Sequence, residues 1–228
     1  MKKTETQQKK PSCRVLIVDD HPAAREGLTW RISQEPGMSV FGEASSIQEA
    51  LELLHPPLPD LAVIDISLQD GSGIDLVGRI RSRFPQLPML VWSMHSDVLY
   101  AERAIRAGAL GYINKGQKTA SVIEAIRTVS QHELYLSEAT SKKMLLRSLT
   151  TAKGANMETP VENLSNRELQ VFQLIGQGQP TSVIASRLRI SVNTVETHRQ
   201  RIKNKLHLRS GAELTCQASR WLLEHEHH

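Results

Sequence analysis

The segment Arg14-Val-Leu-Ile-Val-Asp-Asp-His-Pro (14–22) decides the fold class of this chain. It combines a short continuous apolar run, which is typical of a strand buried on both faces, with two carboxylates directly after the run. A segment with apolar residues at helical spacing follows, from Pro22 to Gln34. A buried strand followed by a helix is the repeating unit of a parallel sheet with crossover helices.

The same unit recurs along the chain as far as about Gln131. The apolar runs that we expect to be strands are 14–18, 38–44, 61–66, 89–94 and 110–114. The segments of helical period between and after them are 22–34, 47–54, 73–84, 97–107 and 120–130. This alternation predicts an α/β doubly wound (βα)5 domain with helices on both faces of a sheet in the order 2-1-3-4-5.

The last third of the chain has a different pattern. Residues 136–162 begin with a short helical stretch and continue as a polar segment punctuated by Gly and Pro, which is typical of a linker. Three or four short helices follow without a strand signal, and the first opens with a capping box of Ser165 and Glu168. A short helix at 182–188, a tight turn at Arg189-Ile190 and a basic helix from 192 to about 206 predict a helix-turn-helix domain.

The chain therefore divides into four parts. We expect a disordered segment at 1–12, an α/β domain at 13–135, a linker with partial helix at 136–162, and an all-α four-helix domain at 163–225. The charge divides in the same way: residues 1–135 hold 15 basic and 16 acidic side chains, whereas residues 136–228 hold 13 basic and 8 acidic ones. A net charge of +4 for the whole chain hides a basic C-terminal part, which favours a nucleic-acid partner there.

Several classes of protein are excluded by composition. A chain with 39% hydrophobic and 4% aromatic residues is neither collagen, coiled coil nor wholly disordered. No apolar run approaches the roughly 18–20 residues of a membrane span, and the N-terminus lacks the apolar core of a signal peptide. We therefore expect a cytoplasmic protein without a membrane partner. The two cysteines, Cys13 and Cys216, form neither a disulfide framework nor a zinc site.

Three carboxylates follow neighbouring strands of the predicted sheet. Asp19 and Asp20 come directly after the first strand, and Asp65 falls near the end of the third. The carboxyl ends of adjacent parallel strands meet at one crevice, and a cluster of oxygen ligands there suits Mg²⁺. Taken singly, Asp20 could instead cap the first helix, and Asp65 could end its strand without a function.

Ser93 and Lys115 add a hydroxyl and an ammonium at the ends of the fourth and fifth strands. Together with the carboxylates they can hold a phosphoryl group on Asp65, with Mg²⁺ and Lys115 neutralising its oxygens and Ser93 donating a hydrogen bond. No glycine-rich phosphate loop follows a strand, so a nucleotide is not the expected donor.

At this point the sequence resembles the receiver domain of two-component response regulators, which has a flavodoxin-like fold. The motifs that carry the resemblance are Leu-Ile-Val-Asp-Asp-His-Pro (16–22), Val-Ile-Asp-Ile-Ser-Leu (63–68), Asp-Gly-Ser-Gly (70–73), Trp-Ser-Met-His (92–95) and Ala-Gly-Ala-Leu-Gly-Tyr-Ile-Asn-Lys (107–115). The resemblance implies that a sensor histidine kinase phosphorylates Asp65 and that Asp19 and Asp20 place the Mg²⁺. It also implies that Ser93 and Tyr112 form a switch pair.

The basic helix of the C-terminal domain has two faces at about 100° per residue. Its apolar stripe contains Val192, Val195, Ile202 and Leu206, and its opposite face contains Asn193, Thr197, Gln200, Arg201 and Asn204. Amides and hydroxyls interleaved with cations suit the major groove of DNA. Arg199 falls inside the apolar stripe, and we expect it to reach a phosphate instead of a base.

Leu-Ser-Asn-Arg-Glu-Leu-Gln-Val-Phe-Gln-Leu-Ile (164–175) and Ile-Ser-Val-Asn-Thr-Val-Glu-Thr-His (190–198) resemble the LuxR-type helix-turn-helix domain. With the receiver in front, the chain resembles a response regulator of the NarL/FixJ subfamily. Carried over by position, the base-facing residues are Glu196, Thr197 and Gln200, and those near the DNA backbone are His198, Arg199 and Lys203. With the rest of the exposed face, the expected DNA contacts are Asn193, Thr194, Glu196, Thr197, His198, Arg199, Gln200, Arg201 and Lys203.

Three functions remain open on the sequence alone. The first is a phosphorylation-controlled transcription regulator that binds double-stranded DNA, dimerises when phosphorylated and is not an enzyme beyond its own phosphorylation and dephosphorylation. The second is a Mg²⁺-dependent phosphatase or phosphotransferase, but Ser67, two residues beyond Asp65, offers no general acid or base for it. The third is a receiver whose output domain binds protein, which the neutral face of Asn193, Thr197 and Gln200 permits.

Overall fold

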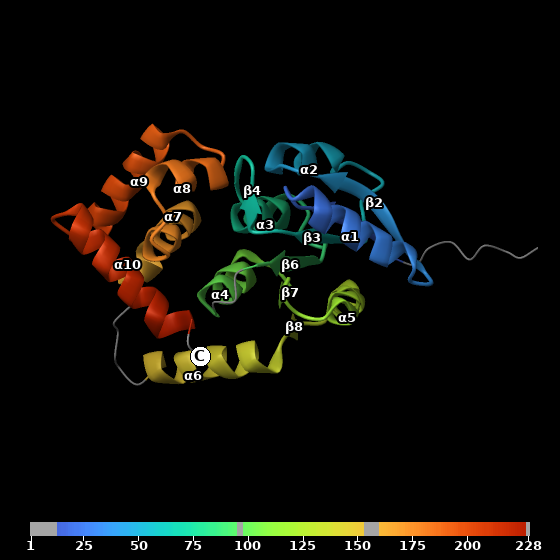
Figure 1. Ribbon diagram of the computed structural model, residues 1–228. Helices are drawn as coiled ribbons and strands as arrows, with labels where there is room; N and C mark the ends of the chain where they lie inside the picture. Colours follow the sequence, from blue (N-terminus) through green and yellow to red (C-terminus); the bar gives the residue numbers. More distant parts are fainter. Residues whose placement is uncertain (1–12, 95–97, 153–159, 227–228) are drawn as a thin grey trace, which may run out of the picture.

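The structure, a computed structural model, describes residues 13–94, 98–152 and 160–226. The segment 1–12 that we expected to be disordered lies outside these residues, and so does 153–159 within the predicted linker. The described part forms an α/β domain followed by a group of helices that packs against it (Figure 1). Among the described residues, no helix is both long enough and apolar enough to span a membrane.

The α/β domain is built on one parallel sheet. Its strands in chain order are β1 (Cys13–Val18), β2 (Met38–Ala44), β3 (Leu61–Ile64), β6 (Met89–Ser93), β7 (Gly111–Asn114) and β8 (Tyr135–Leu136). Their spatial order is β2-β1-β3-β6-β7-β8. The first five of these strands confirm the predicted order 2-1-3-4-5. The short strand β8, which the sequence pattern did not predict, extends the sheet beside β7.

Helices cover both faces of this sheet. They are α1 (Pro22–Ser33), α2 (Ile47–Leu53), α3 (Gly73–Arg83), α4 (Val98–Ala107) and α5 (Thr119–Ser130). The buried side chains of α1 and α5 belong to one hydrophobic cluster, and those of α2, α3 and α4 belong to another. Every residue of the central strand β3 is buried, because the sheet is covered on both sides.

The third strand is shorter than predicted. It ends at Ile64 instead of Ile66, and the chain then forms a hairpin of β4 (Ser67–Leu68) and β5 (Gly71–Ser72) before α3 begins. The hairpin folds back so closely that the Gly73 N–H donates to the Ile66 carbonyl at 2.8 Å. A Cβ atom at Gly73 would lie 1.8 Å from the carbonyl oxygen of Asp65, so only glycine fits this turn.

The connecting helix α6 (Glu138–Ala152) is longer than the short stretch that we expected at 137–148. The C-terminal domain then contains the 3-10 turn η1 (Pro160–Asn163) and the helices α7 (Asn166–Gly176), α8 (Thr181–Arg187), α9 (Val192–Lys205) and α10 (Gly211–Glu226). Ser165 and Glu168 form the predicted capping box of α7, and Ser191 caps α9. The predicted group of four helices with a helix-turn-helix is confirmed.

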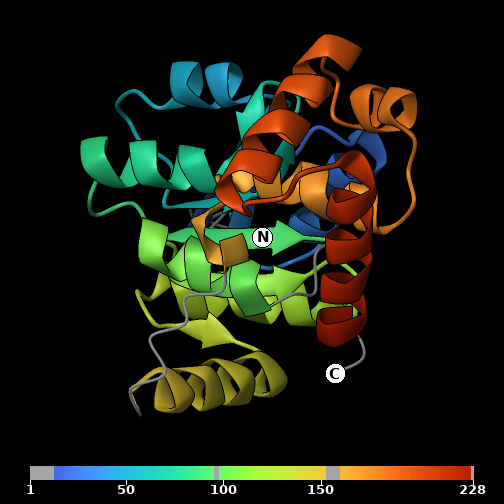
Figure 2. The same cartoon turned by 90° about the vertical axis from the view of Figure 1, so that its left-hand side faces the viewer.

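The two domains are in contact. Figure 2, a view at 90° to Figure 1, shows α7 to α10 in front of the sheet of the α/β domain, with α6 below them. Buried residues of α7 to α10 join the hydrophobic cluster of the α2, α3 and α4 face, so one apolar cluster crosses the domain boundary. Helix α7 is central to it, since all residues from Glu168 to Ile175 are buried.

Candidate functional site

The structure brings together the three carboxylates that follow β1 and β3, which we call the acidic cluster (Asp19, Asp20 and Asp65). The register pairs Val18 with Ile64, and the Asp65 N–H donates to the Val18 carbonyl at 2.8 Å, so the residues after both strands lie side by side. The three side chains are buried, with residue exposures of 1%, 7% and 3%. One carboxylate oxygen from each of them and a ring nitrogen of His21 all lie within 4.8 Å of one another.

Lys115 reaches the same place from the end of β7. Its ammonium Nζ donates to Asp19 Oδ2 at 2.6 Å and lies 3.3 Å from Asp65 Oδ1. The Lys115 N–H donates to the Ser93 carbonyl at 2.7 Å, which joins the ends of β6 and β7. The lysine side chain is 7% exposed and also lies 5.1 Å from the centre of the Trp92 ring. One buried cation therefore faces several carboxylates.

The charge balance of the acidic cluster is unfavourable. Burial raises the pKa of Asp65 to about 6, the nearby Lys115 ammonium opposes this rise, and the Asp19 carboxylate adds to it. Asp20 Oδ1 is buried and accepts no hydrogen bond from the described residues, although His21 Nδ1 lies 2.8 Å away. Buried carboxylate oxygens without enough donors fit a small divalent cation with oxygen ligands, such as Mg²⁺.

The alternative role of Asp20 as a helix cap is not seen. The N-cap residue of α1 is His21, which makes no side-chain capping hydrogen bond, and Pro22 occupies the first turn. The His21 N–H instead donates to Asp19 Oδ1 at 2.9 Å. The Asp20 side chain therefore does not cap α1 and belongs to the acidic cluster.

The two residues that we expected to form a switch pair are both buried. Ser93 is 1% exposed at the end of β6, and Tyr112 is 3% exposed in β7, where it is paired with Val91. The tyrosine ring is therefore inside the protein and not half-exposed at the strand end. Met94, the next residue after Ser93, is 70% exposed, and His95 lies outside the described residues.

Helix α9 presents its polar face to solvent. Asn193, Glu196, Thr197, Gln200 and Arg201 are all exposed, so the α/β domain does not cover them. Val195 and Ile202 are fully buried on the opposite face, and Leu206 is 9% exposed. The predicted polar and apolar faces of this helix are confirmed at these positions.

Val192 is a correction to that pattern, because it is 50% exposed and not part of the buried stripe. It is the first residue of α9, and helical side chains lean toward the N-terminus, which carries this one beyond the packed part of the helix.

Four further predicted DNA contacts, Thr194, His198, Arg199 and Lys203, are only partly exposed. His198 is half-buried, and burial together with the Arg167 guanidinium holds its pKa below its usual range. Arg199 is 21% exposed and its Nε lies 3.5 Å from Glu196 Oε2. The Thr194 N–H donates to the Ser191 hydroxyl at 3.0 Å, and Lys203 is half-buried. These four side chains lie on the flanks of α9, while the exposed polar face lies between them.

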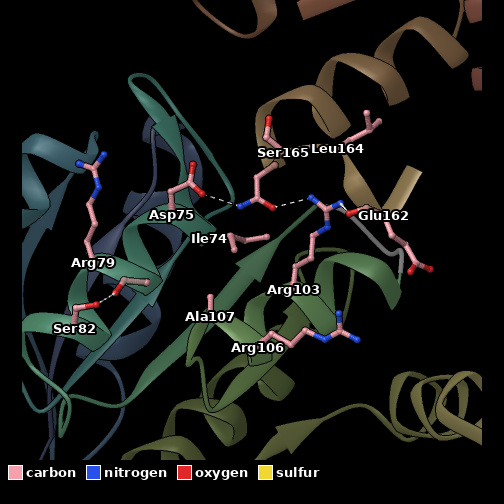
Figure 3. A pocket seen from close by; sticks show the side chains of 12 residues that line it. Ile74, Asp75, Arg79, Ser82, Arg103, Arg106, Ala107, Glu162, Leu164 and Ser165 are labelled. Atoms are coloured by element: carbon pink, nitrogen blue, oxygen red, sulfur yellow. Dashed lines mark hydrogen bonds between the residues drawn. The ribbon is translucent and has the colours of Figure 1, made fainter. Parts of the chain in front are cut away.

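A polar interface joins the domains at the start of α7, and no sequence signal indicated it (Figure 3). Asn166 donates from Nδ2 to Asp75 Oδ1 at 2.8 Å and accepts at Oδ1 from Arg103 Nη1 at 3.0 Å. Arg103 also donates from Nη2 to the Glu162 carbonyl at 3.0 Å. These residues line an interdomain cavity of about 730 Å³, and Arg79 and Arg106 also lie in its lining. Single-sequence patterns do not distinguish such polar residues from ordinary surface residues.

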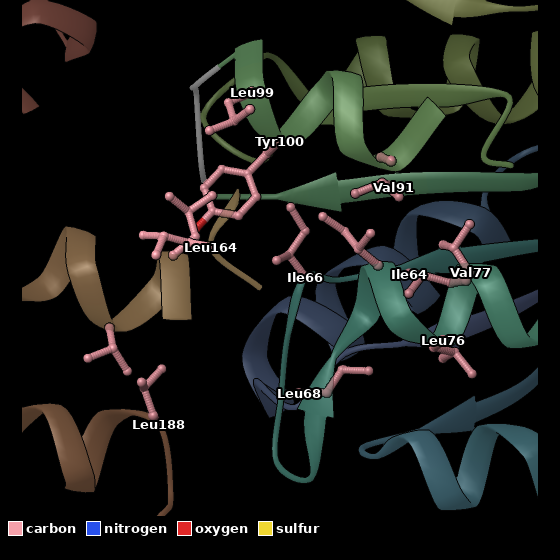
Figure 4. Packing of buried hydrophobic residues seen from close by; sticks show 14 of the residues in the cluster. Ile64, Ile66, Leu68, Leu76, Val77, Val91, Leu99, Tyr100, Leu164 and Leu188 are labelled. Carbon is pink, nitrogen blue, oxygen red and sulfur yellow. The ribbon is translucent and has the colours of Figure 1, made fainter. Parts of the chain in front are cut away.

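An apolar interface continues from there along α7 (Figure 4). Leu164 lies beside Tyr100 and Leu99 of α4, and the Tyr100 hydroxyl donates to Gln173 Oε1 at 2.8 Å in a buried hydrogen bond. Gln170 donates from Nε2 to the carbonyl of Ile66 at 3.4 Å. Ile66 directly follows Asp65 in the chain, so this hydrogen bond holds α7 next to the acidic cluster. The polar face of α9 stays exposed, whereas α7 packs next to the acidic cluster.

Comparison with known families matches both halves of the chain. Residues 15–127 match the response regulator receiver domain, and residues 162–218 match the bacterial regulatory proteins of the luxR family. Among curated proteins, the chain is 34% identical to the transcriptional activator protein ExaE of Pseudomonas putida over 88% of this chain and 92% of that protein. It is 32% identical to the oxygen regulatory protein NreC of Staphylococcus epidermidis over 88% and 94%.

Solved structures show the same architecture. A LuxR-family two-component response regulator from Aurantimonas sp. SI85-9A1 is 30% identical, with a TM-score of 0.58 over 60% of this chain and 99% of its own. RcsB of Salmonella enterica serovar Typhimurium, solved with promoter DNA, has a TM-score of 0.58 at 23% identity over 91% of this chain and 98% of its own. At that identity the likeness concerns the fold alone.

Proposed function

This chain belongs to the two-component response regulators of the NarL/FixJ type, and on that premise we propose that Asp65 is its phosphoryl acceptor, with Asp19 and Asp20 as ligands of Mg²⁺. The protein is a DNA-binding transcription regulator, with a receiver domain followed by a LuxR-type domain. The observation that carries the proposal is the convergence of three buried carboxylates with Lys115 at the ends of adjacent strands.

The proposed reaction transfers a phosphoryl group from a histidine of a sensor kinase. A carboxylate oxygen of Asp65 forms a bond to phosphorus while the bond from phosphorus to the histidine nitrogen breaks. In this proposal Lys115, whose Nζ lies 3.3 Å from Asp65 Oδ1, would neutralise one phosphoryl oxygen, and the buried Ser93 would donate a hydrogen bond to another. When bound, Mg²⁺ supplies further charge neutralisation at the same oxygens.

The proposed response travels from the acidic cluster to helix α7. Ser93 and Tyr112 are the proposed switch pair, and both sit on strands next to α4 and α5. Tyr100 of α4 and the Ile66 carbonyl, which follows the acceptor, both hold α7 through hydrogen bonds. A new dianion on Asp65 would bias this contact and release the C-terminal domain.

The released domain would bind double-stranded DNA through α9. We assign base contacts to Glu196, Thr197 and Gln200, and backbone or flanking contacts to the remaining predicted residues (Asn193, Thr194, His198, Arg199, Arg201 and Lys203). Helix-turn-helix domains read paired half-sites as dimers, so phosphorylation would favour a homodimer. With these partners the proposed location is the cytoplasm, and its own phosphorylation and dephosphorylation are the only catalysis that we assign to it.

Phosphoryl uptake by full-length protein tests the acceptor. Wild-type protein should take label from a small phosphodonor with Mg²⁺, Asp65→Asn should take none, and Asp60→Asn should match the wild type. Asp60 directly precedes β3, at the end of the strand opposite to Asp65. Its Oδ2 lies 3.0 Å from Arg14 Nε. Uptake by Asp65→Asn at wild-type stoichiometry would contradict the assignment.

A further inference from the structure

The turn between α8 and α9 places a cation of the DNA-binding domain at the acidic cluster of the receiver. Arg189 lies in this turn, and its Nη1 is 3.7 Å from Asp20 Oδ2. The Asp20 side chain is 8% exposed, whereas that of Arg189 is 46% exposed, so the guanidinium approaches the cluster from its solvent side. No described residue donates a hydrogen bond to the other oxygen of Asp20, Oδ1.

Arg189 lies in a tight, hydrogen-bonded turn, so the backbone fixes its position. Its φ of 52° is left-handed, which lets the chain reverse between two helices, and its N–H donates to the Ser186 carbonyl at 3.2 Å. Arg167 of α7 donates from Nη2 to the carbonyl of Leu188, the residue before Arg189, at 2.5 Å. The turn is therefore tied to α7, which the receiver holds through Gln170 and Gln173.

Arg167 adds a second positive charge on the same side. Its guanidinium is partly buried and interacts electrostatically with Asp20 and Asp70 of the receiver. Two cations of one domain thus face carboxylates of the other. The acidic cluster has one buried cation of its own, Lys115, which bonds Asp19 and not Asp20.

We propose that Arg189 is a tethered cation for Asp20, and that it competes with Mg²⁺ for this carboxylate. Two cations at one small cluster repel each other, so each weakens the binding of the other. By linkage, the docked arrangement of the domains lowers the affinity for Mg²⁺, and bound Mg²⁺ favours separation of the domains to the same degree. The proposal rests on the assignment of Asp20 as a Mg²⁺ ligand.

Mg²⁺ binding to the full-length protein tests this competition. Titration calorimetry would give the dissociation constant for Mg²⁺ in the wild type, Arg189→Gln and Arg187→Gln. Arg187, exposed on α8 two residues earlier, is the matched control because its replacement changes the net charge equally. Arg189→Gln should tighten Mg²⁺ binding about five-fold, the low end of couplings between sites, since Arg189 is half-exposed. Arg187→Gln should change it less than two-fold.

Asp20→Asn separates failure of this inference from failure of the metal site. If Asp20→Asn weakens Mg²⁺ binding while Arg189→Gln leaves it unchanged, the metal site stands and the competition is wrong. Equal tightening by Arg189→Gln and Arg187→Gln would also overturn the competition, because net charge alone would then explain it. If Asp20→Asn binds Mg²⁺ as the wild type does, the metal-ligand assignment itself is wrong, and the competition fails with it.

Discussion

The acidic cluster of the receiver and the polar face of α9 are both rich in polar side chains, but they are built in opposite ways. The cluster gathers Asp19, Asp20 and Asp65 from two strands and buries them almost completely. The face of α9 takes its residues from one helix and leaves them in water. The acidic cluster exists only in the folded sheet, whereas the polar face of α9 belongs to a single helix.

The difference lies in what each site loses when its ligand is absent. Exposed side chains such as Gln200 keep their hydrogen bonds to water, so an empty face is not destabilised. The buried carboxylates have lost water, and this burial is the main cause of the raised pKa of Asp65. We therefore expect a charge change at the cluster to alter the stability of the receiver strongly. The exposed face of α9, in contrast, is stable without DNA.

Gly73→Ala should have the largest effect, because Gly73 lies against the backbone of Asp65 in the acidic cluster. The new Cβ would lie 1.8 Å from the Asp65 carbonyl oxygen, so the hairpin must shift. We expect a loss of about 3 kcal/mol or more in the free energy of unfolding. Urea unfolding should detect it, with reduced phosphoryl uptake.

The control for this change is Gly78→Ala on the same helix, where a Cβ would meet no atom within 4 Å. Since alanine is the better helix former, this variant should gain about 0.5–1 kcal/mol. A Gly73→Ala protein as stable as the Gly78→Ala protein would show that the cluster does not depend on the tight turn.

Gln200→Ala should affect one base position of the DNA site by about 1–3 kcal/mol and leave phosphoryl uptake unchanged. Arg201→Ala should instead weaken binding to all sequences and lower the salt slope by about 1, because it removes a phosphate contact. Selection of bound sequences from random DNA, with affinities at several salt concentrations, distinguishes the two. Equal loss on every sequence from Gln200→Ala would contradict base recognition.

Glu168→Gln should give the smallest effect. The pKa of Glu168 is shifted in the opposite direction to that of Asp65. Burial raises the pKa of Glu168, but the hydrogen bonds from Lys205 Nζ and the Ser165 N–H outweigh burial and hold the pKa below its usual range. At pH 7 the variant should lose about 1 kcal/mol, since Lys205 is 40% exposed and water screens the pair. A group with a lowered pKa stabilises the folded state only while it is ionised.

The lowered pKa of Glu168 sets how its contribution to the stability of the C-terminal domain depends on pH. The stabilisation by Glu168 should be complete above the unfolded-state pKa of about 4.5 and should vanish as the pH falls through the lower folded-state value. Unfolding can be followed by tryptophan fluorescence. Trp221, which packs edge-on against Phe172 of α7, is the one of the three tryptophans that lies in this domain, and Trp30 and Trp92 of the receiver add to the signal. A difference between wild type and variant that does not shrink as the pH falls below about 4.5 would contradict this account.

Local patterns were sufficient for most elements. Continuous apolar runs identified five strands of the receiver sheet, and the capping box of Ser165 and Glu168 marked the start of α7. The end of β3 was misplaced, because Ile66 is as apolar as Ile64 and only the return of the chain to Gly73 ends the strand. Strand β8 was missed, because two residues carry no periodicity.

The sequence by itself determined the two folds, the family and the convergence of carboxylates at the strand ends, since these follow from local periodicity and from the geometry of parallel strands. Only the tertiary structure decided which face of the C-terminal domain meets the receiver. The contacts of Asn166 with Asp75, of Gln170 with Ile66 and of Arg189 with Asp20 join residues that are 91 or more positions apart in the chain. No local pattern encodes such pairs, because each partner is an ordinary polar residue until the folded surfaces meet.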